Sequence, residues 1–412
     1  MKLKSITILA VMLATILGSA CGKVKAKAEE SPENSSVQAE QPKPLPEGAI
    51  AFDYGNHLYF DVIVRDSIPA KMIFDTGNTN ILIDTKFYKK YFAPSDTLQK
   101  IIIQGAGNSL EAAYKDIAEW KYSVGEYSLT EQGAVVMDLH KILGSGVDGM
   151  FGMEFMHGRK VEFNYADGYM RILSQDDEPA EDYVCIKCKW LDQRKSRILL
   201  PLSVKIDENL SFEGNFLVDM GSSGGLDINS SLAAKLKLTP ANVKKKVYDT
   251  GGVGGSRTDY IFKAKNISVA GKEITNVRTS FSGNTQGSMS DDRYDGLIGN
   301  GLLERFDVIF DFTKGEIWLR ENKNANVTTS YDSGMTLTPY DDYWVVNGLI
   351  EGGNAHKAGV KRGDIIVSIN GLARENIDLK RLKKMNAAAE EWKVVVKRDN
   401  TTQEITFKKE KL

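Results

Sequence analysis

The sequence predicts a mainly β protein, with two duplicated β lobes followed by a small α+β module. An internal repeat fills the middle of the chain, and both copies consist of short runs rich in Val, Ile, Phe and Tyr separated by Gly, Asn and Asp. A separate glycine-rich pattern follows after residue 332. With 412 residues, of which 42% are hydrophobic, the chain can build the cores of two or three domains.

The composition excludes several classes of function. A net charge of −2 lacks the basic surplus that phosphate contacts need, so no nucleic-acid partner is expected. Three cysteines are too few for a disulfide framework, and the four histidines show no metal-binding spacing. Cys185 and Cys188 are interpreted as a local disulfide or as two ordinary strand cysteines. We therefore expect no metal site and no cofactor.

Residues 1–20 have the pattern of a secretory signal peptide, with two lysines, an apolar run over 6–17 and three small residues directly before Cys21. The run is too short for a membrane-spanning helix. Small residues before a cysteine resemble the lipobox of bacterial lipoproteins, although Gly18 stands where that family usually has Leu. The resemblance implies that Cys21 carries lipid and anchors the chain to a membrane. The alternative is ordinary cleavage after Ala20, which leaves a free thiol.

Residues 21–47 predict a disordered tether, because they contain no aromatic residue and hold four of the ten prolines. Such a segment would hold a folded body away from the membrane surface. Lysines follow Cys21 without the acidic cluster that marks surface export in some lipoproteins. The expected location is therefore the bacterial cell envelope, on a periplasm-facing lipid anchor.

The repeat places two aspartates at matched positions. In each copy an apolar strand ends in Asp-x-Gly, at Asp75 and at Asp219, and an Asp-Gly-apolar-apolar-Gly segment follows at nearly equal spacing, ending at Gly152 and Gly299. The better local patterns predict strands and short helices within the copies. These are strands over Leu58–Val64 and Tyr260–Val269 and helices over Thr85–Tyr91 and Ser230–Leu236.

The segment Ile73–Asn78, followed by a second apolar strand, resembles the active-site loop of aspartic peptidases. An isolated Asp-x-Gly is also common in turns, but its recurrence in both copies makes the signal specific. The resemblance covers roughly residues 48 to 325. It implies that Asp75 and Asp219 are the catalytic pair. It also implies active-site loop support from Thr76, Gly77, Asn78, Gly221 and Ser222.

The implied chemistry is hydrolysis of a polypeptide substrate through a water held between the two carboxyls. Like charges this close cannot both ionise cheaply, so the pair shares a proton. Met220 departs from the family, which has Thr or Ser there to bond across the lobe interface. Half of this brace is missing, since a thioether cannot donate a hydrogen bond. Met220→Thr is expected to leave activity equal or higher.

Two further motifs compete with this interpretation. Asp249-Thr250-Gly251 is a closer literal match than the loop at Asp219, but the repeat places it beside the glycines that match Gly105 and Gly107, so a turn is expected. Gly221–Gly225 satisfies G-x-S-x-G and would make Ser223 a nucleophile. That reading needs a later Asp and His, and the only later histidine lies in the C-terminal module.

Two glycine-rich segments resemble the flaps that close over substrate in aspartic peptidases. The residues implied are Gly105, Gly107, Gly252 and Gly254. A flap would hold an extended peptide above the carboxyls as an added strand. The alternative is a tight turn without ligand contact.

The run Ala-Gly-Val-x-x-Gly-Asp-x-Ile-x-x-Ile-Asn-Gly over 358–371 is similar to bacterial PDZ domains. The resemblance implies a groove that accepts a peptide ligand by strand addition, between the strand near 343–346 and a helix over Leu379–Ala388. The strand residues implied are Tyr343, Trp344, Val345 and Val346. A strand over Trp392–Lys397 and a hairpin turn at Asp399-Asn400 are expected to complete the module.

Together these patterns predict an envelope aspartic-type endopeptidase with a PDZ peptide-binding module. The alternative is a peptide-binding pseudoprotease that is catalytically weak or inactive. The predicted boundaries are 1–20 for the signal peptide, 21–47 for the tether, 48–178 and 179–325 for the lobes, and 332–412 for the PDZ domain.

Overall fold

The structure is a computed structural model that describes residues 44–92, 98–269, 271–325, 331–388 and 390–411. Leu45–Leu412 forms one compact unit. The predicted signal peptide, the lipidation site at Cys21 and nearly all of the tether lie outside the described residues. Within the described ranges, no helix combines the length and apolarity needed to cross a membrane.

The first lobe is built on an eight-stranded sheet, in the order β2-β3-β4-β9-β5-β8-β7-β6. Its strands are β2 (Asp53–Tyr54), β3 (Leu58–Val64), β4 (Ile68–Asp75), β5 (Leu82–Asp84), β6 (Leu98–Ile103), β7 (Glu111–Val124), β8 (Tyr127–Met137) and β9 (Gly149–Gly152). Its helices are α1 (Thr85–Tyr91), α2 (His140–Leu143) and α3 (Met153–Met156). Asp84 caps α1 by accepting hydrogen bonds from the amides of Lys86 and Phe87. The strand predicted for β3 and the helix predicted for α1 are both confirmed.

The second lobe repeats this arrangement. Its strands are β13 (Lys189–Trp190), β14 (Ile198–Lys205), β15 (Ser211–Val218), β16 (Leu226–Ile228), β17 (Lys244–Tyr248), β18 (Arg257–Lys263), β19 (Asn266–Val269), β20 (Lys272–Ile274), β21 (Arg278–Ser282) and β22 (Gly296–Ile298). Its helices are α4 (Ser230–Leu236), η1 (Ser288–Ser290) and α5 (Asn300–Leu303). The predicted helix α4 is confirmed, and Asn229 caps it through a 2.7 Å hydrogen bond from Leu232.

The prediction of one strand over Tyr260–Val269 was wrong. The chain changes partners at Ala264 and Lys265, because β18 pairs with β17 and β21 whereas β19 pairs with β14 and β20. The Lys265 amide donates to the carbonyl of Ile206 at this corner. A continuous run of β-forming residues does not reveal where a strand leaves one partner for another.

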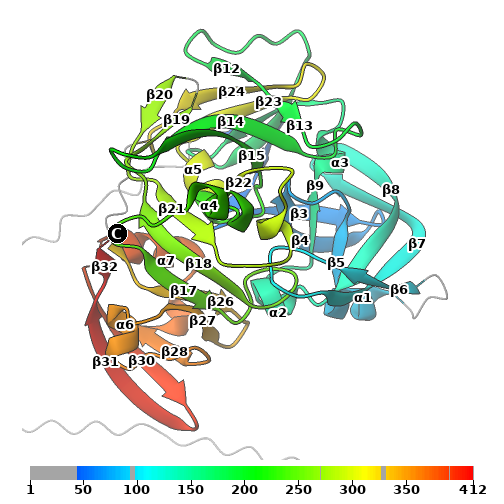
Figure 1. The fold of residues 1–412 in the computed structure, drawn as a ribbon. Helices are drawn as coiled ribbons and strands as arrows, with labels where there is room; N and C mark the ends of the chain where they lie inside the picture. The colour runs from blue at the N-terminus through cyan, green and yellow to red at the C-terminus, as the bar shows by residue number, and fades with distance from the viewer. Residues whose placement is uncertain (1–43, 93–97, 270, 326–330, 389, 412) are drawn as a thin grey trace, which may run out of the picture. The chain divides into compact units, whose positions relative to one another are not determined.

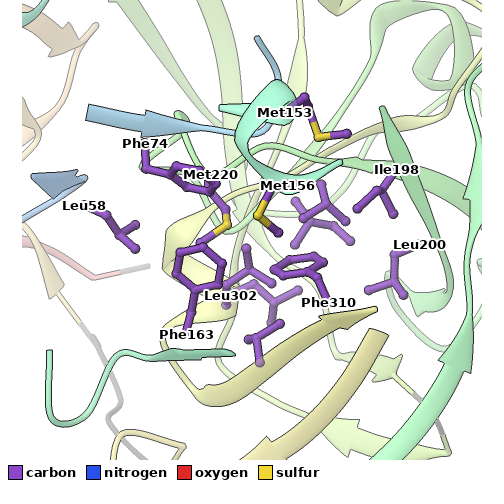
Figure 2. Close-up of a cluster of buried hydrophobic side chains, with 14 of the residues drawn as sticks. Leu58, Phe74, Met153, Met156, Phe163, Ile198, Leu200, Met220, Leu302 and Phe310 are labelled. Atoms are coloured by element: carbon purple, nitrogen blue, oxygen red, sulfur yellow. The ribbon is translucent and has the colours of Figure 1, made fainter. Parts of the chain in front are cut away.

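A six-stranded sheet joins the two lobes, in the order β1-β11-β10-β23-β24-β12. Its strands are β1 (Ala49–Ala51), β10 (Lys160–Asn164), β11 (Tyr169–Leu173), β12 (Val184–Lys187), β23 (Phe306–Asp311) and β24 (Glu316–Glu321). The closing strands of the two repeats, β10 and β23, pair antiparallel at its centre. One hydrophobic core continues across the lobes, and Figure 2 shows Phe163 and Phe310 within it.

The C-terminal module has its own core around Trp344, Val346, Ile369 and Trp392. Its elements are β25 (Tyr331–Asp332), β26 (Met335–Pro339), β27 (Trp344–Ile350), α6 (Asn354–Lys357), β28 (Ile365–Ile369), β29 (Leu372–Ala373), η2 (Arg374–Asn376), α7 (Leu379–Ala388), β30 (Glu391–Arg398), β31 (Thr401–Lys408) and β32 (Glu410–Lys411). The predicted helix over α7 is confirmed, as is the turn at Asp399 and Asn400, where both residues have positive φ.

The module shares a sheet with the second lobe. Strand β17 pairs antiparallel with β27 through Lys246–Tyr248 and Gly348–Ile350. Figure 1 shows β17 and β18 beside β26 and β27. The C-terminal module is therefore joined to the second lobe by main-chain hydrogen bonding as well as by side-chain contacts.

Candidate active site

The two repeated aspartates meet where the lobes meet. Asp75 ends β4 and Asp219 directly follows β15. In each lobe the Asp-Gly-apolar-apolar-Gly segment forms a strand parallel to the one that leads into the loop, β9 beside β4 and β22 beside β15. The two carboxyls are hydrogen-bonded to each other. The fold thus brings together side chains that are far apart in the sequence.

Glycines make this close approach possible. The Gly77 amide donates to Asp75 Oδ1 at 2.7 Å, and the Gly221 amide donates to Asp219 Oδ1 at 2.9 Å. A Cβ atom on Gly221 would lie 2.3 Å from the Asp75 carboxyl carbon, and one on Gly77 would lie 3.0 Å from that of Asp219. A larger residue at Gly221 would therefore force the two loops apart.

The turns after the carboxyls also match. The Asn78 amide donates to the Asp75 carbonyl at 3.2 Å, and the Ser222 amide donates to the Asp219 carbonyl at 3.1 Å. Ser222 Oγ accepts a hydrogen bond from Gly224. Asn78 and Ser222 thus shape equivalent turns, and the cavity at the site is lined by both.

The surroundings of the pair favour one shared proton. Burial raises the pKa of Asp75, opposed by the hydrogen bonds it accepts and by the charge of Arg197. Burial and the charge of Asp75 together raise the pKa of Asp219 well above its usual value. Two carboxyls in contact titrate as a unit, so the pair holds one proton over an extended pH range. Within the pair, protonation is therefore favoured at Asp219.

One hydroxyl braces both loops. Thr76 Oγ1 donates to the Val218 carbonyl at 2.7 Å and accepts from the Met220 amide at 3.0 Å. One hydroxyl of the first lobe therefore takes part in both hydrogen bonds between these loops. The Met220 side chain makes no such bond. It is fully buried in the core near Phe74 and Phe163, as Figure 2 shows. The departure at Met220 exchanges a polar brace for apolar packing.

Met220→Thr should lower the free energy of unfolding by about 1–3 kcal/mol, because a buried side chain is shortened in a packed core. Activity per folded molecule should be equal or higher, since a hydroxyl here can bond across the interface. Thermal unfolding and active-site-normalised cleavage rates separate the two effects. Met220→Leu, which keeps the volume, is the control. A clear activity loss in folded Met220→Thr would contradict the pairing of this loop with that of Thr76.

Sequence reasoning missed two basic residues beside the pair. Ile73, two positions before Asp75, pairs with Tyr59, and His57 lies two positions before Tyr59. In the same way, Leu217, two positions before Asp219, pairs with Leu199, and Arg197 lies two positions before Leu199. His57 and Arg197 therefore occupy equivalent places in the two lobes, and both line the cavity at the site. The register of the repeat was the signal that could have found them.

Each of these residues acts on the opposite lobe. His57 hydrogen-bonds with the backbone of Gly221, and Arg197 favours the ionised form of Asp75. Burial lowers the pKa of His57 to about 4, which outweighs the opposing hydrogen bond. Within the described residues, His57 Nδ1 and Arg197 Nε are buried without hydrogen-bond partners. The cavity beside the carboxyl pair thus holds a guanidinium and, above a pH of about 4, a neutral imidazole.

Arg197→Gln should raise the pKa of Asp75, because a positive charge that favours its ionised form is removed. If the singly protonated pair is the active form, the acid limb of the pH profile of kcat/KM should move to higher pH. Arg197→Lys, which keeps the charge, should leave the limb close to wild type. An unmoved acid limb in Arg197→Gln would show that the guanidinium does not act on the pair.

The carboxyls lie at the wall of a cavity of about 520 Å³. The first lobe gives it an apolar wall. This wall consists of Leu82, Ile103, Val135, Leu139, Ile142, Leu143 and Met150. The second lobe gives it a charged wall, where Arg257 lies 2.7 Å from Asp259 and 3.4 Å from Asp227. The two walls differ in chemistry although the lobes share one fold.

The two predicted flap tips meet each other across the cavity. The amides of Gly107 and Ser109 donate to the carbonyls of Val253 and Gly254, at 2.8 and 2.9 Å. Gly105, Gly107, Gly252 and Gly254 all lie in these tips, and the cavity is lined by Gly105 and Gly252. A Cβ atom on Gly107 would lie 2.2 Å from the backbone of Gly254, so the tips need glycine to touch.

The competing motifs have other places. Asp249–Gly251 lies in the connection between β17 and β18, where the amides of Asp249 and Thr250 donate to the Asn347 carbonyl and side chain. Ser223 lines the cavity, but His356 is exposed in the C-terminal module and accepts a hydrogen bond from Gly352. The structure thus offers Ser223 no histidine from that module.

The remaining predicted residues lie away from the carboxyls. Tyr343 precedes β27, and Trp344, Val345 and Val346 lie on it. This strand has partners on both sides, so the edge that is unpaired in the described residues beside it belongs to β26 instead. Cys185 is exposed, Cys188 is half-buried, and both thiols are free.

Two family models match separate parts of the chain. Residues 60–155 match a family model described as aspartyl protease, and residues 345–396 match a PDZ domain model. No curated protein matches the chain. Among solved structures, the crystal structure of aspartic proteinase from Irpex lacteus matches with a TM-score of 0.41 and 13% identity, covering 68% of this chain and 99% of that one. These matches identify an aspartyl protease-like segment in the first lobe and a PDZ-like segment in the C-terminal module.

Proposed function

We propose that this chain is an aspartic-type endopeptidase that hydrolyses peptide bonds in polypeptides. The observation that carries the proposal is the half-buried, mutually hydrogen-bonded pair Asp75 and Asp219 at the wall of a cavity that residues of the two flap tips also line. The family match over residues 60–155 includes Asp75 and supports the same class of chemistry.

The pair would act with one proton. The ionised carboxyl, favoured at Asp75 by Arg197, accepts a proton from a water as that water attacks the peptide carbonyl. The protonated carboxyl, favoured at Asp219, donates to the carbonyl oxygen as negative charge develops there. The flap tips would exclude bulk water and hold the substrate main chain extended.

A specific observation favours the second candidate, a peptide-binding pseudoprotease. Thr76 is the sole source of the hydroxyl bonds across these two loops, since the Met220 side chain packs into the core. Looser loops would keep the cavity and its peptide affinity while losing the carboxyl geometry that hydrolysis needs.

Cleavage of unfolded casein at several pH values tests both candidates. Wild-type cleavage that disappears in Asp75→Asn and in Asp219→Asn supports the endopeptidase. Binding without cleavage supports the pseudoprotease. Cleavage that survives both substitutions would exclude the aspartic mechanism.

We further propose that the chain is a lipid-anchored, periplasm-facing protein of the bacterial envelope, with Cys21 as the lipid site. The signal-like residues 1–20 and the proline-rich segment that follows support this proposal. Cys21→Ser should release the protein from the membrane fraction. Retention of the variant on the membrane would contradict lipidation at this position.

A further inference from the structure

We propose that the free edge of β26 in the PDZ domain and the carboxyl pair bind one substrate chain. A single extended polypeptide would pair with β26 and continue past Asp75 and Asp219, so that cleavage occurs at a set distance from the PDZ-bound segment. This inference rests on the proposed function for its cleavage step, whereas the shared binding site stands on geometry.

The first observation is that the space between β26 and α7 and the space beside the carboxyls form one cavity. The lining that includes Asp75 and Asp219 also includes Thr336–Pro339 of β26 and Leu379 at the start of α7. A strand and helix of the PDZ domain therefore face the same space as the carboxyls. A peptide on β26 needs no hinge to reach them.

The second observation is that the outer edge of β26 is unpaired at Leu337. Among the residues that the structure describes, β26 pairs with β27 and with no other strand. Leu337 lies opposite Val346, whose amide and carbonyl are both engaged on the far side, with Asp364 and Gly363. In an antiparallel ladder, the main-chain groups of Leu337 must then point away from β27. They face the free edge, where an added strand would bond.

The third observation is that the PDZ domain is held against both lobes near this edge. The Pro339 carbonyl accepts a hydrogen bond from the Ser145 amide of the first lobe at 3.1 Å. Lys383 of α7 forms an ion pair with Glu304 of the second lobe and lies 4.2 Å from the ring centre of Tyr54. These contacts of β26 and α7 with the two lobes set the distance between β26 and the carboxyls.

The flap of the second lobe is tied to the same domain. Asn347 of β27 donates to the Thr250 carbonyl at 2.7 Å and accepts from its amide at 2.9 Å. Arg362 lies 3.3 Å from Asp249. The flap, the PDZ strands and the carboxyl loops thus form one framework around the cavity, which fits a single extended occupant.

Nested peptides test the proposal. Sites cleaved in unfolded casein are mapped by mass spectrometry, and peptides of about six residues, spanning roughly 20 Å, are compared with versions extended at either end. Extension at one end should raise kcat/KM about tenfold or more, as expected for two or more additional main-chain hydrogen bonds. Equal kcat/KM for all lengths, or an equal gain from both ends, would overturn the proposal.

Leu337→Pro removes the outward amide without removing a bond to β27, and proline is tolerated on a sheet edge. The ratio of kcat/KM for extended to short peptide should collapse towards one in this variant and persist in Leu337→Val, which keeps the amide. A ratio that persists in folded Leu337→Pro would overturn the proposal. If Leu337→Pro does not fold, the extension peptide alone should inhibit cleavage of the extended substrate in wild type; no inhibition would overturn it.

Binding to the Asp219→Asn chain separates this inference from the proposed function. Peptides selected on that variant from a casein digest are compared in truncated and extended forms. Length-dependent affinity without any wild-type cleavage would overturn the endopeptidase and support the shared site. Cleavage without length dependence would support the endopeptidase and overturn the shared site.

Discussion

Asp219→Asn should abolish peptide cleavage and at the same time raise the melting temperature at neutral pH. The loss of activity should be on the order of 10⁴-fold or more, because an amide cannot share the proton that the mechanism requires. The gain in stability follows from burial and from the neighbouring Asp75, which both make ionisation of Asp219 unfavourable in the folded protein.

The sign of the pH dependence follows from this raised pKa. The folded state keeps a proton on Asp219 at pH values where the unfolded chain, with a pKa near 3.8, has lost it. The free energy of unfolding of the wild type therefore falls as pH rises above about 4, until the folded pKa is passed. Asp219→Asn removes this loss, so its stability advantage should be small at pH 3 and larger at pH 7.

Thermal unfolding at both pH values, with casein cleavage in parallel, checks this prediction. Asp207→Asn, which removes an exposed carboxylate from the turn between β14 and β15, is the control and should change neither quantity much. Retained cleavage in Asp219→Asn would exclude its catalytic role. An unchanged or lower melting temperature at pH 7 would show that the carboxyl is not strained by burial.

Thr76→Val should cause the largest loss of stability among the site variants. The substitution keeps the shape of the side chain but leaves the buried Val218 carbonyl and Met220 amide without their partner. Unsatisfied buried groups cost about 1–3 kcal/mol each, so the free energy of unfolding should fall by about 2–4 kcal/mol. Activity should also fall, because this hydroxyl is what holds the two loops together.

Urea unfolding and the cleavage rate of the folded fraction measure these two effects. Thr76→Ser keeps the hydroxyl and should restore most of both. If Thr76→Val unfolds like the wild type, the cross-lobe bonds do not hold the lobes together. If Thr76→Ser is as damaged as Thr76→Val, the methyl group rather than the hydroxyl is what matters.

Local pattern was sufficient for much of the fold. The strand Leu58–Val64 and the helices Thr85–Tyr91 and Ser230–Leu236 form as predicted, because side-chain periodicity and capping residues act over a few neighbouring positions. The break between Lys263 and Asn266 was missed, since it depends on which distant strand lies beside each half.

The same division holds at the site. The repeat identified the two loops that carry Asp75 and Asp219. For Met220, the sequence indicated only that a hydroxyl is missing at this position. In the structure the Met220 side chain packs into the core, and the Thr76 hydroxyl alone makes two hydrogen bonds to the opposite loop. Packing against another lobe leaves no mark in the local sequence.

Sequence by itself determined the duplication, the paired Asp-x-Gly loops, the glycine-rich tips and the PDZ pattern, because each depends on short motifs and their spacing. Only the tertiary structure decided that the carboxyls touch, that His57 and Arg197 flank them, and that β26 faces the same cavity. These facts depend on strand register and on contacts between lobes. Such contacts are set by the folding of the whole chain, since they join segments separated by more than a hundred residues.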